Sequence, residues 1–311
     1  MSDPCPRCQS QIEYYRNDVC PKCNFHIHDF LNFLSTVNIR VISLDRLIGN
    51  GFLSGQIELY SDYNRPIERA LKKCVRDYVD GNKVRANFEL ARIDNFIKDL
   101  EIISKKDNEM KNDIVDELKK SVNDISDFYG ARFEANVCAS LIRKGANLEK
   151  RERPDISVKT EEGAKIYIEC TTRRTPKKTE EVYEKIVYKA TKGKSKKDYS
   201  GMYTALFIDA TNVTYRYSDT EEAKRKYSDE NHITHKNELK SKFTEEEDDL
   251  KFGSVLTFTS IYDMEENKIR RLYTRYDHTR AQEQLCSAMD AWYPMSSEPV
   301  HVARGAIPVE G

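Results

Sequence analysis

The sequence has no apolar run that approaches the ~20 residues of a membrane-spanning helix. It also has no internal repeat with a period of about 20–50 residues, which excludes solenoid and propeller architectures. Its formal net charge is −1, so the protein as a whole has no basic field and any attraction to nucleic acid must be local. No hydrophobic signal segment lies at the start of the sequence, and we therefore expect a cytoplasmic protein with reduced thiols and no membrane partner.

The composition is nevertheless that of a globular protein. Of the 311 residues, 39% are apolar and 33% are charged. The apolar residues recur in regular patterns, which indicates packed helices and strands with highly charged surfaces and argues against disorder. The length suits two domains plus a small additional module.

Four of the eight cysteines form two Cys-x₂-Cys pairs near the start of the chain, Cys5 with Cys8 and Cys20 with Cys23. Two such pairs provide four thiolates for one tetrahedral Zn²⁺. Disulfides are the alternative, and a reducing compartment favours zinc. The segment has almost no apolar core, so the metal would supply most of its folding free energy. We expect a structural zinc ribbon at residues 1–28.

A short hairpin in the middle of the chain carries two carboxylates. Residues 155–159 and 164–172 alternate between polar and apolar side chains, which predicts two half-buried strands, and residues 160–163 suit the turn between them. Asp155 begins the first strand and Glu169 lies late on the second, so a twisted hairpin brings the two carboxylates together. Because like charges repel unless a cation lies between them, this pair predicts a Mg²⁺ or Mn²⁺ site.

The order of these motifs resembles that of the PD-(D/E)xK nuclease superfamily: a helix that carries Glu134, then Pro154-Asp155, then Glu169-Cys170-Thr171. The resemblance covers residues 125–275 and implies an α/β, restriction-endonuclease-like fold, a three-layer core around a mixed sheet. It implies that Asp155, Glu169 and the carbonyl oxygen of Cys170 bind the catalytic Mg²⁺ or Mn²⁺. Glu134 would bind a second metal ion or orient a water molecule.

The function that the resemblance implies is metal-dependent hydrolysis of phosphodiester bonds, and we expect a DNA endonuclease of the restriction or anti-phage type. The metal ion would activate a water molecule for in-line attack on the phosphorus. The sequence leaves open whether the nucleic acid is DNA or RNA. It also leaves open a homo-oligomer or an activating partner protein, since an unregulated nuclease would harm its own cell.

One motif position departs from the family, because Thr171 stands where the family has a lysine. That lysine positions the attacking water or stabilises negative charge on the phosphate, and a threonine has no charge to do so. A helix predicted to begin near residue 179 carries Lys189 and Lys192, and we expect one of them to supply the cation. A solvated face that contacts phosphate generally is the alternative. Lys165 lies roughly 13 Å along the strand from Glu169 and is a poor substitute.

Basic residues gather on both sides of this predicted helix. They give affinity for phosphates without reading a base sequence, and a flexible charged loop is the alternative interpretation. The candidates for nucleic-acid binding are Arg173, Arg174, Lys177 and Lys194.

We divide the chain into four parts, of which the zinc ribbon is the first. A mostly helical accessory region follows, then the nuclease-like core with a charged, exposed insertion, and then a C-terminal extension of unassigned role. The accessory region spans residues 29–124 and the nuclease-like core spans residues 125–280. The charged insertion lies within the core at residues 216–251, and the C-terminal extension spans residues 281–311. After the core hairpin and its crossover helix, further strands are predicted at residues 202–210, 254–261 and 268–276.

Two other functions remain compatible with the sequence. Loss of the motif lysine fits a catalytically inactive nuclease fold that binds nucleic acid or a partner protein. The apolar stripe of the helical region, which includes Ile114, Leu118 and Val122, fits a protein that acts through assembly. An ordinary α/β domain with solvated acidic residues is the plainest alternative.

Overall fold

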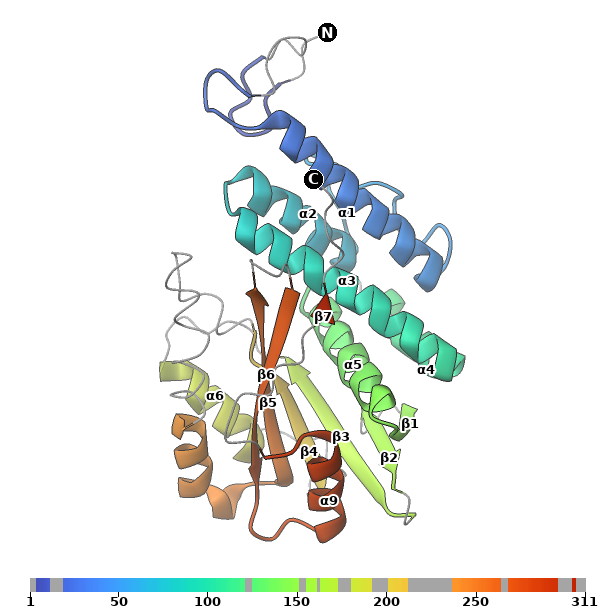
Figure 1. Ribbon diagram of the computed structural model, residues 1–311, viewed down its shortest axis with the longest axis vertical. Helices are drawn as coiled ribbons and strands as arrows, with labels where there is room; N and C mark the ends of the chain where they lie inside the picture. Colours follow the sequence, from blue (N-terminus) through green and yellow to red (C-terminus); the bar gives the residue numbers. More distant parts are fainter. Residues whose placement is uncertain are drawn as a thin grey trace.

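Figure 1 shows the computed structural model, in which a layered sheet domain carries a stack of helices at one end. The structure describes most of the chain, in ten segments. They are residues 4–11, 19–120, 125–150, 155–160, 163–172, 180–191, 201–211, 237–263, 268–295 and 304–305.

Among the described residues, four helices form the accessory region. They are α1 (Ile27–Ile48), α2 (Pro66–Val79), α3 (Lys83–Lys106) and α4 (Asn108–Lys120). The apolar spacing predicts helices from residue 66 onward, whereas the first of the four lies in a segment where no helix is predicted. Helix α3 contacts α1 and α2 on one side and strand β6 (Lys268–Asp277) on the other, so it joins the helical region to the sheet (Figure 1). The segment that follows α1 is held by Asp45, whose two carboxylate oxygens accept hydrogen bonds from the amides of Gly51 and Leu53, both at 2.8 Å.

The sheet begins after α5 (Ile125–Arg143), the helix that carries Glu134. Among the described residues, seven strands follow one another across the sheet in sequence order. Strands β1 to β3 form an antiparallel meander, β3, β4 and β5 run parallel, and β6 and β7 are again antiparallel to their neighbours. The strands other than β6 are β1 (Asn147–Lys150), β2 (Ile156–Lys159), β3 (Lys165–Thr172), β4 (Gly201–Asp209), β5 (Phe252–Asp263) and β7 (Arg304–Gly305), and α6 (Glu180–Thr191) connects β3 to β4.

Helices cover both faces of this mixed sheet, which gives three layers. On β4, Phe207 belongs to the core shared with α5 and with α9 (Glu283–Trp292). The adjacent Leu206 and Ile208 belong to a second core with α6 and the helical stretch 237–245. Because neighbouring side chains of a strand point to opposite faces, β4 is buried on both sides.

The structure confirms an α/β protein with a mixed sheet, and it corrects one expectation. Residues 237–250 of the charged insertion are not simply exposed, because Leu239, Phe243 and Leu250 are buried against the sheet. Within the C-terminal extension, α9 packs on the main core through buried Leu285 and Met289. In residues 237–250 a few buried apolar residues outweigh a charged composition.

Strand β1 was not predicted. Its four residues pair with β2 at the edge of the sheet, and only one of them, Leu148, is a buried apolar residue. Among the described residues, no helix is both long enough and apolar enough to cross a membrane.

Candidate functional site

The four N-terminal cysteines meet at one point, as their spacing predicts. One sulfur from each lies within 4.8 Å of the other three. The Sγ atoms of Cys5 and Cys23 are 3.7 Å apart, and those of Cys8 and Cys20 are 3.6 Å apart. Zinc–sulfur bonds of about 2.3 Å in a tetrahedron place the sulfurs about 3.8 Å from one another, so the cluster has the dimensions of a ZnS₄ site. The distances are far too long for disulfides, and all four thiols are free.

Two copies of one backbone turn bring these cysteines together. In the first, the amide of Gln9 donates to the carbonyl oxygen of Cys5 at 2.9 Å, and in the second the amide of Asn24 donates to that of Cys20 at 2.8 Å. Gln9 and Asn24 both have the left-handed backbone conformation, with φ of 61° and 55°. The site is therefore built by local turns, which is why its spacing is visible in the sequence.

The thiols of the cluster differ in acidity. Burial, together with the neighbouring Cys8 thiol, raises the pKa of Cys23 to about 12. Burial acts the same way on Cys20, but hydrogen bonds from the Ser10 hydroxyl and from the amide of Lys22 outweigh it and lower the pKa of Cys20 to about 6. Four adjacent thiols cannot all ionise without a cation between them, and a bound divalent metal ion would hold all four as thiolates.

The cysteine module packs against the helical region. Tyr60, in the loop that follows α1, accepts a hydrogen bond from the side chain of Gln9 and donates one to the carbonyl oxygen of Pro6 at 3.5 Å. Arg7 reaches the carbonyl oxygen of Asp80, just beyond α2. These contacts place the module against the helices.

The predicted carboxylate pair lies at the start of β2 and late on β3. Ile156 pairs with Ile168, so Asp155 stands one position earlier, across from Glu169. The backbone amide of Cys170 donates to Oδ2 of Asp155 at 2.6 Å. The predicted ligand Asp155 is therefore bonded to the backbone of the residue that follows Glu169.

Glu134 reaches the same region from α5. Desolvation raises the pKa of the Cys170 thiol well above its ordinary value, and the negative charges of Asp155, Glu134 and Glu169 raise it further. Cys170 thus lies within the electrostatic field of all three predicted carboxylates. Oxygen donors with this much negative charge are suited to a hard divalent cation.

An open cavity of about 500 Å³ adjoins this region and is lined by Glu134, Cys170 and Thr171. Asp155 and Glu169 are not among its lining residues, and Asp155 adjoins it through its bond to Cys170. Among the described residues, only the four cysteines bring three ligand atoms within 4.8 Å of one another, so the three carboxylates surround Cys170 without closing to that distance. The strand alternation gives a reason: Ile166 and Ile168 face the core shared with α5, so Glu169 points to the opposite face.

The lysine predictions have mixed outcomes. Nζ of Lys165 lies 3.8 Å from a carboxylate oxygen of Glu149 on β1, which agrees with its exclusion from the site. The side chain of Lys189 is not described, so its predicted role stays a prediction. Other predicted residues lie outside the described residues, and these are Pro154, Arg173, Arg174, Lys177, Lys192 and Lys194.

One basic residue that lines this cavity is not among the residues that the sequence predicts for the site. Lys120, the last residue of α4, lines the cavity beside Glu134 and Thr171. It belongs to the helical region, 51 positions before Thr171 (171 − 120). Only the packing of α4 against α5 brings it to the cavity, and no local motif marks such a residue.

Buried charges fix α5 against α3. The carboxylate of Glu89, on α3, accepts hydrogen bonds from Arg92 at 3.1 Å and from Arg132 of α5 at 3.3 Å. Arg92 also donates to Asp209, at the end of β4, at 3.2 Å. The burial of Glu89 acts to raise its pKa, but the guanidinium groups of Arg92 and Arg132 outweigh it and lower the pKa to about 2. This cluster ties the helix that carries Glu134 to both the helical region and the sheet.

The chain matches no protein-family model, and no curated protein or solved structure is significantly similar to it. The function must therefore be argued from the chain's own side chains and from the order of its secondary-structure elements.

Proposed function

We propose that the protein is a metal-dependent nuclease that hydrolyses phosphodiester bonds. The observation that carries this proposal is the hydrogen bond of 2.6 Å between the Cys170 amide and Asp155, in a field shared with Glu134 and Glu169. This bond lies beside an open cavity of about 500 Å³, and it supports the proposal because it joins two of the predicted motif elements.

The order of elements supports the same proposal. Helix α5, the antiparallel hairpin of β2 and β3, the connecting helix α6 and the parallel strand β4 follow one another as the resemblance implies. A restriction-endonuclease-like fold is thus part of the proposal. The finer assignment to a DNA endonuclease of the restriction or anti-phage type rests on the resemblance.

Each residue has a defined role in the proposal. Asp155 and Glu169, with the carbonyl oxygen of Cys170, would hold Mg²⁺ or Mn²⁺, which would stabilise negative charge on the phosphate and lower the pKa of a water molecule. Glu134 approaches from α5 and would orient the attacking water or hold a second ion. Lys120 would supply, from outside the motif, the positive charge that Thr171 lacks.

The four cysteines would hold a structural Zn²⁺. A site with four protein ligands leaves no open position for substrate, so this metal would contribute folding free energy and no chemistry. The packing of the module against Tyr60 agrees with a structural role.

The test is cleavage of plasmid, linear duplex, single-stranded DNA and RNA, each with Mg²⁺ and with Mn²⁺. We expect Asp155→Asn and Glu169→Gln each to reduce cleavage at least about 10³-fold, which corresponds to ~4 kcal/mol of transition-state stabilisation. Glu149→Gln is the matched control, because Glu149 is a 51% exposed carboxylate on the neighbouring strand β1 and pairs with Lys165. Equal cleavage by the wild type and either site variant would refute the assignment.

A second candidate function is supported by two observations. Thr171 replaces the motif lysine, and the described carboxylates do not close within 4.8 Å. Both fit an inactive nuclease fold that binds nucleic acid or a partner protein. Retained nucleic-acid binding without cleavage in any divalent metal would favour this candidate.

A further inference from the structure

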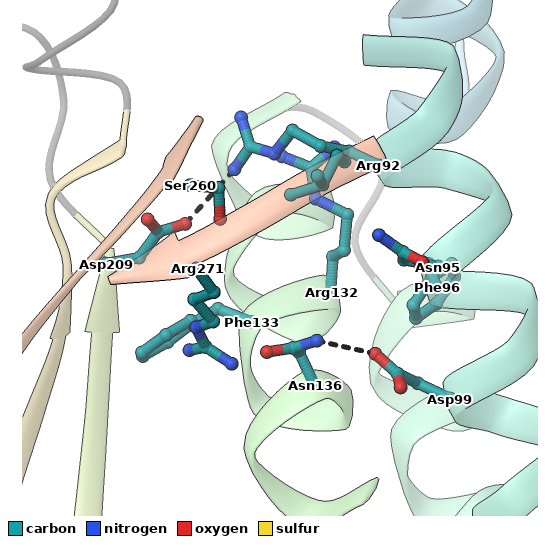
Figure 2. A pocket seen from close by; sticks show the side chains of 11 residues that line it. Arg92, Asn95, Phe96, Asp99, Arg132, Phe133, Asn136, Asp209, Ser260 and Arg271 are labelled. Atoms are coloured by element: carbon teal, nitrogen blue, oxygen red, sulfur yellow. Dashed lines mark hydrogen bonds and ion pairs between the residues drawn. The ribbon is translucent and has the colours of Figure 1, made fainter. Parts of the chain in front are cut away.

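A second, smaller cavity lies between α3, α5 and the sheet (Figure 2). Arg132 and Asn136 line it from one face of α5, and Glu134, two residues from each, belongs to the opposite face of that helix. The cavity volume is about 50 Å³. One water molecule needs about 10–15 Å³ by the same measure, so the cavity has room for roughly four oxygen-sized atoms.

The wall of this cavity is rich in guanidinium groups. Arg92 comes from α3, Arg132 from α5 and Arg271 from β6, and Figure 2 shows these side chains around the same space. The guanidinium of Arg271 lies 4.1 Å from the ring centre of Phe258 and 5.4 Å from that of Phe133. Polar groups of Asn95, on α3, and Ser260, on β5, complete the wall.

Two carboxylates also line the cavity, and both already accept hydrogen bonds from protein donors. Oδ2 of Asp99 accepts a hydrogen bond from Asn136 at 2.7 Å, and its Oδ1 accepts one from Arg143 at 3.1 Å. The two oxygens of Asp209 accept hydrogen bonds from Arg92 and from the amide of Thr211. Each carboxylate oxygen thus already has a donor.

Among the described side chains that line this cavity, Arg132 carries a buried donor with no partner. The residue is 5% exposed, and its Nη1 donates to Glu89. Its Nη2 is buried and finds no hydrogen-bond acceptor in the described part of the chain. Burial and the positive charge of Arg92 both lower the pKa of Arg132. Arg92 and Arg132 share Glu89, and Arg92 also pairs with Asp209, so the acceptor that this cluster lacks is one for Nη2 of Arg132.

We propose that this cavity binds a phosphate-type oxyanion, to which Nη2 of Arg132 donates. Guanidinium groups match the geometry of tetrahedral oxyanions and are weakly hydrated, so they suit such a buried site. Room for about four oxygens admits one phosphate or sulfate but excludes a nucleoside. The anion is either free in solution or the terminal phosphate of a nucleotide or nucleic-acid strand whose remainder stays outside.

The experiment uses the full chain and needs no cleavage activity, so it is independent of the proposed nuclease function. Thermal unfolding and calorimetric titration are measured with inorganic phosphate, sulfate, a 5′-phosphorylated dinucleotide and the same dinucleotide without phosphate, all at equal ionic strength in chloride. Arg132→Met removes the donor and keeps the apolar part of the side chain. Arg132→Lys keeps the positive charge and removes the planar guanidinium group that can donate two parallel hydrogen bonds. Arg85→Gln is the control, because Arg85 lies on α3, is 45% exposed and pairs with Asp77.

We expect saturating phosphate to raise the unfolding temperature of the wild type and of Arg85→Gln by several degrees. The Kd for phosphate should rise at least tenfold in both Arg132 variants. Selective binding of the phosphorylated dinucleotide would identify a terminal phosphate as the natural occupant and would also support the site. The proposal is overturned if neither phosphate source binds the wild type, or if Arg132→Lys, which retains the charge, binds as tightly as the wild type.

Discussion

The four cysteines and the three carboxylates are both predicted metal sites, but in the structure only the cysteines bring their ligand atoms close together. The cysteines span residues 5–23 and bring their sulfurs within 4.8 Å of one another. The carboxylates span residues 134–169, come from a helix and two strands, and share the surroundings of Cys170 without closing to that distance.

The difference shows what each kind of site depends on. Two repeated turns, closed by the amides of Gln9 and Asn24, are enough to aim the cysteines at one point. The carboxylates depend on the packing of α5 against the hairpin, and a buried ion pair between Arg132 and Glu89 joins α5 to α3. The first site is therefore determined locally, and the second is determined by the whole domain.

The largest expected effect concerns the local site. We expect one Zn²⁺ per chain in the wild type and its loss in Cys20→Ser, because structural zinc contributes about 10–16 kcal/mol of apparent binding free energy in zinc-finger peptides. Elemental analysis and proteolysis before residue 27 would show metal loss and local unfolding. Cys286→Ser is the control, since Cys286 is a free thiol on α9 and outside the cluster. Unchanged zinc content in Cys20→Ser would contradict the site.

A smaller effect is expected at the ion pairs that position α5. The pKa of Glu89 is about 2 in the folded protein and about 4.3 when unfolded, so its ionised form stabilises the fold. This stabilisation, on the order of 3 kcal/mol, is fully present above the unfolded pKa and is lost as the pH falls from about 4.5 to 2. Urea denaturation across this range should show a weaker pH dependence for Glu89→Gln than for the wild type. Identical pH profiles would mean that Glu89 does not anchor α5.

The same contrast explains how much the sequence could predict. The spacing of Cys5, Cys8, Cys20 and Cys23 predicts their meeting, because few backbone bonds separate them. Strand β4 was predicted at residues 202–210 and is found at Gly201–Asp209. Its apolar run is nearly continuous because helices cover both faces of the sheet there.

The features that could not be predicted depend on contacts distant in sequence. Strand β1 has little apolar signal because it lies at an edge of the sheet. Leu239 and Phe243 are buried at helical spacing within a stretch dominated by Lys and Glu, which hides them. Arg132 and Lys120 lie on helices, and the spacing of apolar residues along a helix does not predict which cavity its polar residues line.

The smallest expected effect, on the cleavage rate, gives the most specific test of the site formed by the three carboxylates. Lys119 and Lys120 are adjacent at the end of α4, and of the two only Lys120 is among the residues that line the cavity with Glu134. We expect Lys120→Ala to lower the cleavage rate by about 10–10²-fold, or about 1.4–2.7 kcal/mol, because it removes a cation that would face the phosphate. Lys119→Ala removes the same charge from the same turn and should leave the rate unchanged. If both variants lose activity equally, the general charge of α4 matters and Lys120 has no specific role. If neither variant loses activity, Lys120 does not supply the proposed cation, and Lys189 and Lys192 remain the predicted candidates.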